Sequence, residues 1–126
     1  MDLILQILFI LFLVWLTLRW FYPVKGMIPL PVSVARERMK DENVVFIDVR
    51  TPEEFKRNNA EPFKNIPLPT LQTKVNQLNK DKEIVLICQS GMRSRQAAKL
   101  LIKMGFKKVY NIQGGMNAWG GRVCAR

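Results

Sequence analysis

The sequence predicts an α/β domain with a doubly wound, mainly parallel sheet, preceded by one N-terminal transmembrane helix. Short β-branched apolar runs, such as VVFIDV (44–49) and EIVLI (83–87), have the length of buried strands, and amphipathic helical patterns alternate with them. Strands that alternate with helices form parallel sheets that are covered on both faces. A third observation, a continuous apolar segment at the N-terminus, predicts the transmembrane helix.

The chain therefore divides into three parts. Its 126 residues comprise a transmembrane anchor at 1–22, a linker at 23–32 and an α/β domain at 33–126. The linker, PVKGMIPLPV, is expected to be stiff because it contains three prolines. The last part is long enough to form one hydrophobic core.

The N-terminal segment is apolar on every side. Residues 3–18 read LILQILFILFLVWLTL, and the aromatic residues that follow extend the segment to about 20 residues, roughly 30 Å as a helix. A core helix of a small soluble domain would carry a polar face. A cleaved signal peptide would begin with basic residues and end in small ones, whereas this segment begins Met-Asp and ends RWFYP. We therefore predict a retained, single-pass membrane anchor that contacts lipid.

Charge predicts the orientation of the anchor and its surroundings. Arg19 and Lys25 follow the apolar segment, whereas only Asp2 precedes it, so the positive-inside rule places the α/β domain in the cytoplasm. The formal net charge of +10 suits an anionic membrane surface, an anionic substrate or nucleic acid. We expect no nucleic-acid partner, because no basic block interleaved with aromatic residues and no nucleic-acid motif is present.

The first elements of the domain are predicted by capping signals. Ser33 is expected to cap a short helix that ends at about Lys40, and the strand 44–49 follows. Thr51 is then expected to be an N-cap, with Pro52 at the first helical position and Glu54 completing a capping box.

The remaining elements follow from periodicity. In order, they are a short strand around 65–66, a helix from Thr70 with Leu71, Val75 and Leu78 on one face, the strand 83–87, a helix over 93–104, a strand over 107–112, and a turn with a short helix over 114–119. Gly105 is expected at the C′ position that ends the helix over 93–104.

Two features of the composition exclude several kinds of chemistry. The chain contains no histidine, which excludes Ser-His-Asp and Cys-His catalysis and histidine-ligated metal sites. Its two cysteines, Cys88 and Cys124, are too few for a structural zinc site or a disulfide framework. We expect no cofactor and no metal ion, and any reaction at a cysteine must obtain its thiolate from the fold itself.

Cys88 is the candidate nucleophile. It follows a predicted strand, and ligands of open α/β sheets gather at the carboxyl ends of strands. The loop QSGMR leads from Cys88 into a helix, so that backbone N–H groups and the helix N-terminus surround the sulfur with partial positive charge. Gly91 permits a positive φ, and Arg93 and Arg95 add positive potential. Such a cysteine is expected to react as a thiolate; the alternative is an inert core cysteine.

The motifs around this loop resemble those of the rhodanese-like domain family. The resemblance rests on C-x-x-G-x-R-S from Cys88, DVRTPEEF (48–55), NIPL (65–68), GF..VYN (105–111) and GGMNAW (114–119), and it extends from about Ser33 to Trp119. It implies a sulfurtransferase or persulfide carrier with a doubly wound α/β fold. In such a protein, Cys88 takes sulfane sulfur from a small anionic donor such as thiosulfate, holds it as a persulfide and passes it to a thiol, cyanide or protein acceptor.

The resemblance also implies roles for individual residues. The substrate-binding loop would consist of Gln89, Ser90, Gly91, Met92, Arg93 and Ser94, whose backbone amides hold the terminal sulfur. Arg93 would either bind the anionic donor or brace the loop through contacts with carbonyl groups. Ser94 is expected to be the N-cap of the following helix. Asp48 and Arg50 are expected to support the loop, with direct contact with the substrate as the alternative.

Other functions remain open at this point. Phosphatases and arsenate reductases share this architecture but use C-x5-R, and here that arginine position is Ser94, with arginines on either side. A catalytically idle module that binds or regulates a membrane partner is a further alternative. Cys124 either resolves a persulfide at Cys88 or lies in the tail without a role.

The sequence departs from the family pattern in one segment. NNAEPFK (58–64) stands where the family commonly has GHIPGAI. Because the glycines are missing, we expect Asn58 or Asn59 to supply a positive φ. The departure affects the expected substrate preference and leaves the expected fold unchanged.

Overall fold

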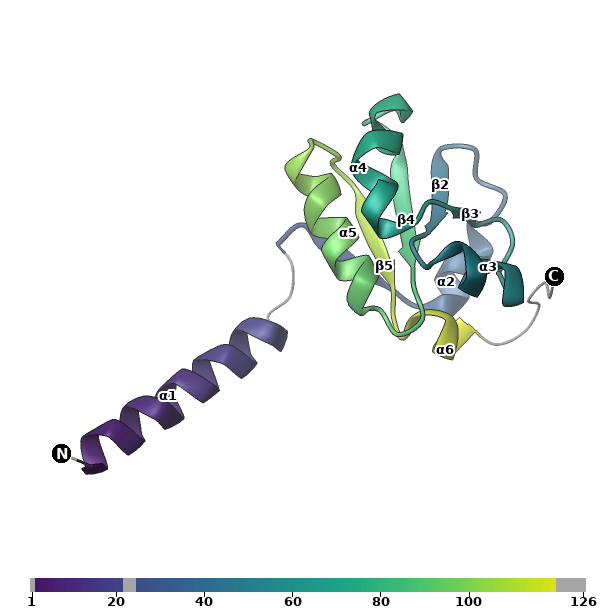
Figure 1. Cartoon of the computed structure of the whole chain (residues 1–126). Coiled ribbons are helices and arrows are strands. Elements are labelled where there is room, and N and C mark those ends of the chain that lie inside the picture. The colour runs from purple at the N-terminus through teal and green to yellow at the C-terminus, as the bar shows by residue number, and fades with distance from the viewer. Residues whose placement is uncertain (1, 22–24, 120–126) are drawn as a thin grey trace.

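The computed structural model describes residues 2–21 and 25–119. A single helix projects from an α/β domain (Figure 1). The sheet consists of β1 (Met27–Leu30), β2 (Val44–Asp48), β3 (Lys64–Asn65), β4 (Glu83–Ile87) and β5 (Val109–Ile112). The helices are α1 (Asp2–Phe21), α2 (Val32–Glu37), α3 (Pro52–Arg57), α4 (Leu71–Lys74), α5 (Met92–Lys103) and α6 (Gly115–Trp119), with 3₁₀ turns η1 (Leu68–Thr70) and η2 (Val75–Gln77).

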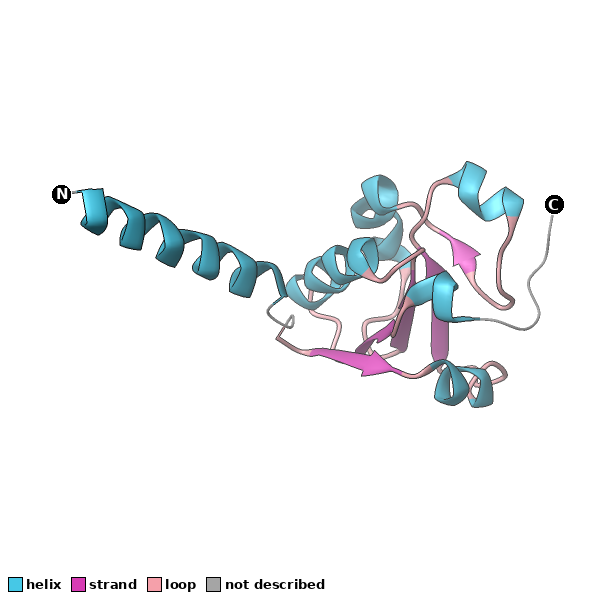
Figure 2. Ribbon diagram, turned by 90° about the horizontal axis from the view of Figure 1, so that it is seen from below, coloured by secondary structure: helices cyan, strands magenta, loops and turns pink. Residues whose placement is uncertain are grey.

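The five strands form one parallel sheet in the order β1-β5-β4-β2-β3. The strand β4 lies at its centre, and its side chains alternate between two cores: Ile84 and Leu86 pack on one face, Val85 and Ile87 on the other. The first core also contains side chains of α4 and α5, and the second contains side chains of α2 and α6. Helices therefore lie on both sides of the strands (Figure 2), as the predicted doubly wound fold requires.

The capping signals locate two helix ends correctly. Thr51 is the N-cap of α3, and its side chain and that of Glu54 form the reciprocal bonds of a capping box. Gly105 follows α5 with φ 102°, a conformation that favours glycine. The helix expected from Thr70 is instead a composite of η1, α4 and η2, in which Leu71 and Val75 are fully buried.

The predicted linker is too long, because its second half belongs to the sheet. Met27–Leu30 forms β1, which pairs in parallel with β5. Pro29 obscures this strand in the sequence, yet proline is tolerated at a sheet edge, where one side of the strand has no partner. The helix α2 then begins earlier than expected: its N-cap is Pro31 and has no side-chain hydrogen bond, so the prediction of a Ser33 cap is wrong.

The helix α1 has no apolar partner in the domain along most of its length. Every described side chain in it is exposed. Among the described residues it is the one helix long and apolar enough to cross a membrane, with a mean hydropathy of 2.2 over Asp2–Trp20. Burial against the domain therefore does not explain why α1 is so apolar.

Candidate active site around Cys88

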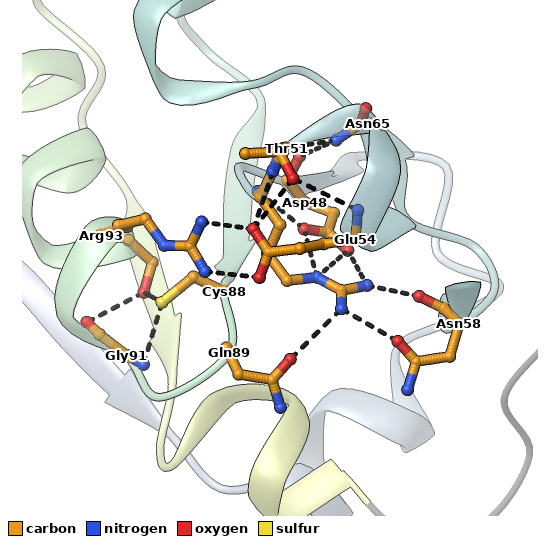
Figure 3. A network of polar contacts seen from close by, with 11 residues as sticks. Asp48, Thr51, Glu54, Asn58, Asn65, Cys88, Gln89, Gly91 and Arg93 are labelled. Carbon is orange, nitrogen blue, oxygen red and sulfur yellow. Dashed lines mark hydrogen bonds and ion pairs between the residues drawn. The ribbon is translucent and has the colours of Figure 1, made fainter. Parts of the chain in front are cut away.

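Cys88 lies directly after β4, at the carboxyl end of the central strand, and is fully buried. The backbone N–H of Gly91 donates a hydrogen bond to its sulfur at 2.9 Å, and the Ser94 hydroxyl lies 3.4 Å from the same atom (Figure 3). An N–H group at this distance stabilises negative charge on the sulfur. The loop thus supplies the polar contacts that a nucleophilic thiol requires in a chain without histidine.

Gly91 gives the loop its shape. It is the N-cap of α5 with φ 104°, so the prediction that Ser94 caps this helix is wrong. Ser94 instead lies in the first turn of α5, where its buried hydroxyl donates to Oδ1 of Asn111 at 2.5 Å. The side-chain amide of Asn111 in turn donates to the Gly91 carbonyl at 3.3 Å. No role was predicted for Asn111, although the motif GF..VYN ends at this polar residue, near the end of a predicted strand.

The short helix α6 also contacts the Cys88 loop, through hydrogen bonds to its backbone. The backbone N–H of Met116 donates to the Cys88 carbonyl at 2.8 Å, and that of Asn117 donates to the Gln89 carbonyl at 3.1 Å. The Gln89 side-chain amide also donates to Oδ1 of Asn117 at 2.6 Å. This approach needs glycine at position 115, where φ is 58° and an ideal Cβ would collide with the Cys88 carbonyl oxygen. The sequence motif GGMNAW predicted this helix but not its function as a support.

We expect Gly115→Ala to misplace the loop and slow any reaction at Cys88 by roughly 100-fold, the order of effect of an ångström-scale displacement at a reacting centre. The backbone carbonyls of Cys88 and Gln89, which cannot rotate away as side chains do, would have to move. Gly105→Ala is the matched control, because φ is also positive there while an added Cβ meets only the flexible Lys80 side chain. Equal losses of activity in steady-state assays of the two variants would contradict the argument.

Arg93 joins the loop to α3. Its guanidinium donates two hydrogen bonds to the Glu54 carboxylate, at 2.6 and 2.9 Å (Figure 3). These bonds lower the pKa of Glu54 to about 2. The same pair raises the pKa of Arg93. Since the folded-state pKa of Glu54 is below its ordinary 4.5, the stabilisation from this pair is complete above pH 4.5 and is lost as the pH falls towards 2. Arg93 therefore contacts a carboxylate, not the carbonyl groups that the bracing alternative expected.

Asp48 and Arg50 form a buried ion pair beside the loop. Their side chains are 0% and 1% exposed, and Nη2 of Arg50 lies 2.9 Å from Oδ2 of Asp48. Arg50 also donates to the Asn58 carbonyl at 2.6 Å and to the Gln89 side-chain oxygen at 3.4 Å. Arg50 thus connects the end of β2 to the Cys88 loop and to the segment after α3. The pair lies where residues that support the loop were expected.

The segment that departs from the family pattern is built without a left-handed residue. Asn58 has φ −158° and ψ 142°, and among the described residues only glycines have a positive φ. The prediction that Asn58 or Asn59 supplies a positive φ is therefore wrong. Asn59 is buried and donates to the Phe55 carbonyl at 2.9 Å, and the peptide bond between Glu61 and Pro62 is cis.

The remaining predicted residues are at the periphery. Ser90 is exposed, and Met92 is exposed at the start of α5. Arg95 donates to the carbonyl of Trp20 in α1. The predictions for Cys124 lie outside the described residues. Within the described part of the chain, no three His, Cys, Asp or Glu side chains gather in a way that could hold a metal ion.

Comparison with known proteins gives the family. Residues 32–122 match the rhodanese-like domain family. The uncharacterized protein YqhL of Bacillus subtilis is 33% identical over 125 residues, which cover 99% of this chain and 98% of YqhL. A sulfurtransferase of Allochromatium vinosum is 33% identical over 87 residues, covering 69% of this chain and 81% of that protein.

Solved structures agree with this assignment. The crystal structure of a rhodanese-like domain protein from Staphylococcus aureus superposes with a TM-score of 0.71 at 27% identity. The match covers 79% of this chain and 99% of the S. aureus chain. The family match spans the Cys88 loop and both elements that support it, α3 and α6. The chain is therefore a member of the rhodanese-like domain family.

Proposed function

We propose that this protein is a membrane-anchored sulfurtransferase or persulfide carrier that uses Cys88 as its nucleophile. The observation that carries the proposal is the Gly91 N–H group directed at the Cys88 sulfur from 2.9 Å. A persulfide anion needs such N–H donors and needs no general base. The sulfurtransferase of A. vinosum, which belongs among the relatives of this chain, supports the same class of reaction.

The proposed reaction has two steps. The Cys88 thiolate attacks the outer sulfur of thiosulfate; a bond forms between the two sulfurs, the bond to the sulfonate sulfur breaks, and sulfite leaves with its electron pair. The enzyme then carries a persulfide anion. In the second step, cyanide attacks the terminal sulfur, thiocyanate leaves and the thiolate is restored. A thiolate of a small molecule or protein can replace cyanide as the acceptor.

The surroundings of the thiol favour sulfur over phosphate esters. The position at which phosphatases carry the arginine of C-x5-R is Ser94, whose hydroxyl is buried and bonded to Asn111. Arg50 and Arg93, which lie near the loop, are both paired with carboxylates. Backbone N–H groups are therefore the proposed binding site for the terminal sulfur, and the arginines hold the loop in place.

Access to the sulfur requires movement of a side chain. Cys88 is fully buried, so a donor must displace a group that covers it.

We further propose that residues 1–22 anchor the protein and that the domain faces the cytoplasm. The uniform exposure of α1 and its mean hydropathy of 2.2 support a membrane span. The alignment with YqhL, which covers 99% of this chain, includes this region. Arg19 and Lys25 at the domain side of α1 support the orientation.

Intact-mass measurement tests the proposed function. The full chain in detergent is incubated with thiosulfate, and we expect a gain of one sulfur atom, about 32 Da, as a persulfide. Addition of cyanide should remove this mass and release thiocyanate. Absence of the adduct with thiosulfate and with a persulfidated thiol would refute sulfur transfer and leave an idle binding module. Turnover of a phosphate ester would instead indicate a phosphatase.

A further inference from the structure

The outer face of α5 carries a basic stripe that the proposed reaction does not use. Arg95, Lys99 and Lys103 are spaced by four residues and therefore share one side of the helix. The buried side of α5 contains Ala97 and Leu101. Like charges four residues apart destabilise a helix. An anion bound on this side would therefore reduce the repulsion among the three basic side chains.

The chain connectivity holds this basic stripe close to the end of α1. The covalent connection from Phe21 to Met27 spans at most roughly 20 Å even when fully extended. The side chain of Ile102 in α5 lies against Gly26, just before β1. The guanidinium of Arg95 donates to the Trp20 carbonyl in the last turn of α1 at 3.3 Å. In Figure 1, α5 is accordingly at the side of the domain nearest to α1.

A cavity of about 930 Å³ lies between α1 and α5. Its charged lining is wholly basic: Arg19, Lys25, Arg95 and Lys99. The rest of the lining is mainly apolar and includes Trp15, Met92 and Ile102. We call the four basic residues the cationic rim of the cavity and its apolar residues the apolar wall.

We propose that this cavity binds the headgroup of an anionic phospholipid, with the phosphate against the four cations and the glycerol and first methylenes against the apolar wall. The proposal rests on the membrane placement proposed above. In that placement Trp15 lies deeper in the bilayer than Arg19, so the α1 side of the cavity changes from apolar to basic towards the membrane surface, as a lipid molecule does. A free phosphate would use only the cationic rim, and an acidic protein would leave the apolar wall without a partner.

The position of the cavity connects it to the active site. Met92 lines the cavity and directly follows Gly91, which contacts the Cys88 sulfur. A lipid held here would fix the first turn of α5 at the membrane surface. The Cys88 loop, which leads into that turn, would then lie close to the membrane surface.

Lipid binding to the full chain tests the inference. The protein is extracted from membranes in neutral detergent, and phosphatidylglycerol or phosphatidylcholine is titrated while native mass spectrometry counts bound lipid. We expect the wild type to prefer phosphatidylglycerol. The double variant Arg95→Gln with Lys99→Gln should bind it about 30-fold more weakly, the order expected for the loss of two cations near a lipid surface. Bound phosphatidylglycerol should also decrease as salt is raised.

The matched control is Lys56→Gln with Arg57→Gln, which removes the same two residue types from α3, at the side of the domain away from α1 (Figure 1). This control should bind phosphatidylglycerol as tightly as the wild type does. If it lost as much affinity as the Arg95/Lys99 double variant, net charge alone would explain the binding and the inference would be overturned. Equal binding of the two lipids by the wild type, or displacement by inorganic phosphate, would also overturn it. Unfolding temperatures confirm that the variants fold. Resistance of the wild type to alkaline extraction tests the anchor separately, so failure of the anchor and failure of the cavity are distinguishable.

Discussion

Cys88→Ser should abolish formation of the persulfide and reduce sulfur transfer to the rate measured without protein. The serine hydroxyl retains the approximate shape of the thiol but is not ionised at neutral pH, and oxygen cannot form the sulfur–sulfur bond on which the cycle depends. The expected result is a variant with no mass gain after thiosulfate treatment and no thiocyanate after cyanide. Intact mass and a thiocyanate assay measure the two steps independently.

The second cysteine provides the control for this prediction. Cys124→Ser should gain the same mass as the wild type if Cys124 has no role. If Cys124 resolves the persulfide, the variant should accumulate more of the adduct, because the step that forms a disulfide is missing. A persulfide that persists in Cys88→Ser would place the nucleophile elsewhere and contradict the assignment. Because Cys88 is buried, near-UV circular dichroism should confirm that its serine variant remains folded.

Much of the fold follows from local signals in the sequence. The strand EIVLI is found over Glu83–Ile87 because a short β-branched run between polar residues has few alternatives. The capping box at Thr51 and Glu54 is correct because its bonds are made within four residues. The sequence also places Cys88 at the carboxyl end of a strand, because a strand followed by a loop and a helix puts the loop at the carboxyl edge of the sheet.

Features that depend on distant partners could not be predicted in the same way. The strand β1 contains Pro29 and exists because β5 pairs with it, a contact between residues some eighty positions apart. Glu54 carries a capping signal, and nothing local indicates that it also pairs with Arg93. Gly115 reads as a turn residue, whereas its position is determined by the Cys88 carbonyl against which it packs. The candidate site is therefore predictable at Cys88 and at the Asp48–Arg50 pair, and not at the contacts that Glu54 and Gly115 make with the loop.

Asp48→Asn should destabilise the domain by about 3–5 kcal/mol, because it leaves the Arg50 guanidinium buried without a counter-charge. Arg50 is 1% exposed and directs three hydrogen bonds from its side chain at the Asp48 carboxylate. A loss of this size is a large share of the roughly 5–15 kcal/mol that stabilises a domain. Denaturant titration of the full chain in detergent, followed by tryptophan fluorescence, measures the change. Asp41→Asn, in the partly exposed pair with Arg38, is the control and should cost less than about 1 kcal/mol.

The double variant Asp48→Leu with Arg50→Met separates stability from function. Removal of both charges leaves no buried ion without a partner, so this variant should be more stable than Asp48→Asn despite carrying two substitutions. It also loses the contacts of Arg50 with Gln89 and Asn58, through which the ion pair supports the Cys88 loop. We therefore expect a folded protein with slow sulfur transfer. A double variant as active as the wild type would show that the ion pair contributes only to folding. A double variant less stable than Asp48→Asn would show that packing around the two side chains, and not their charge, stabilises this edge of the sheet.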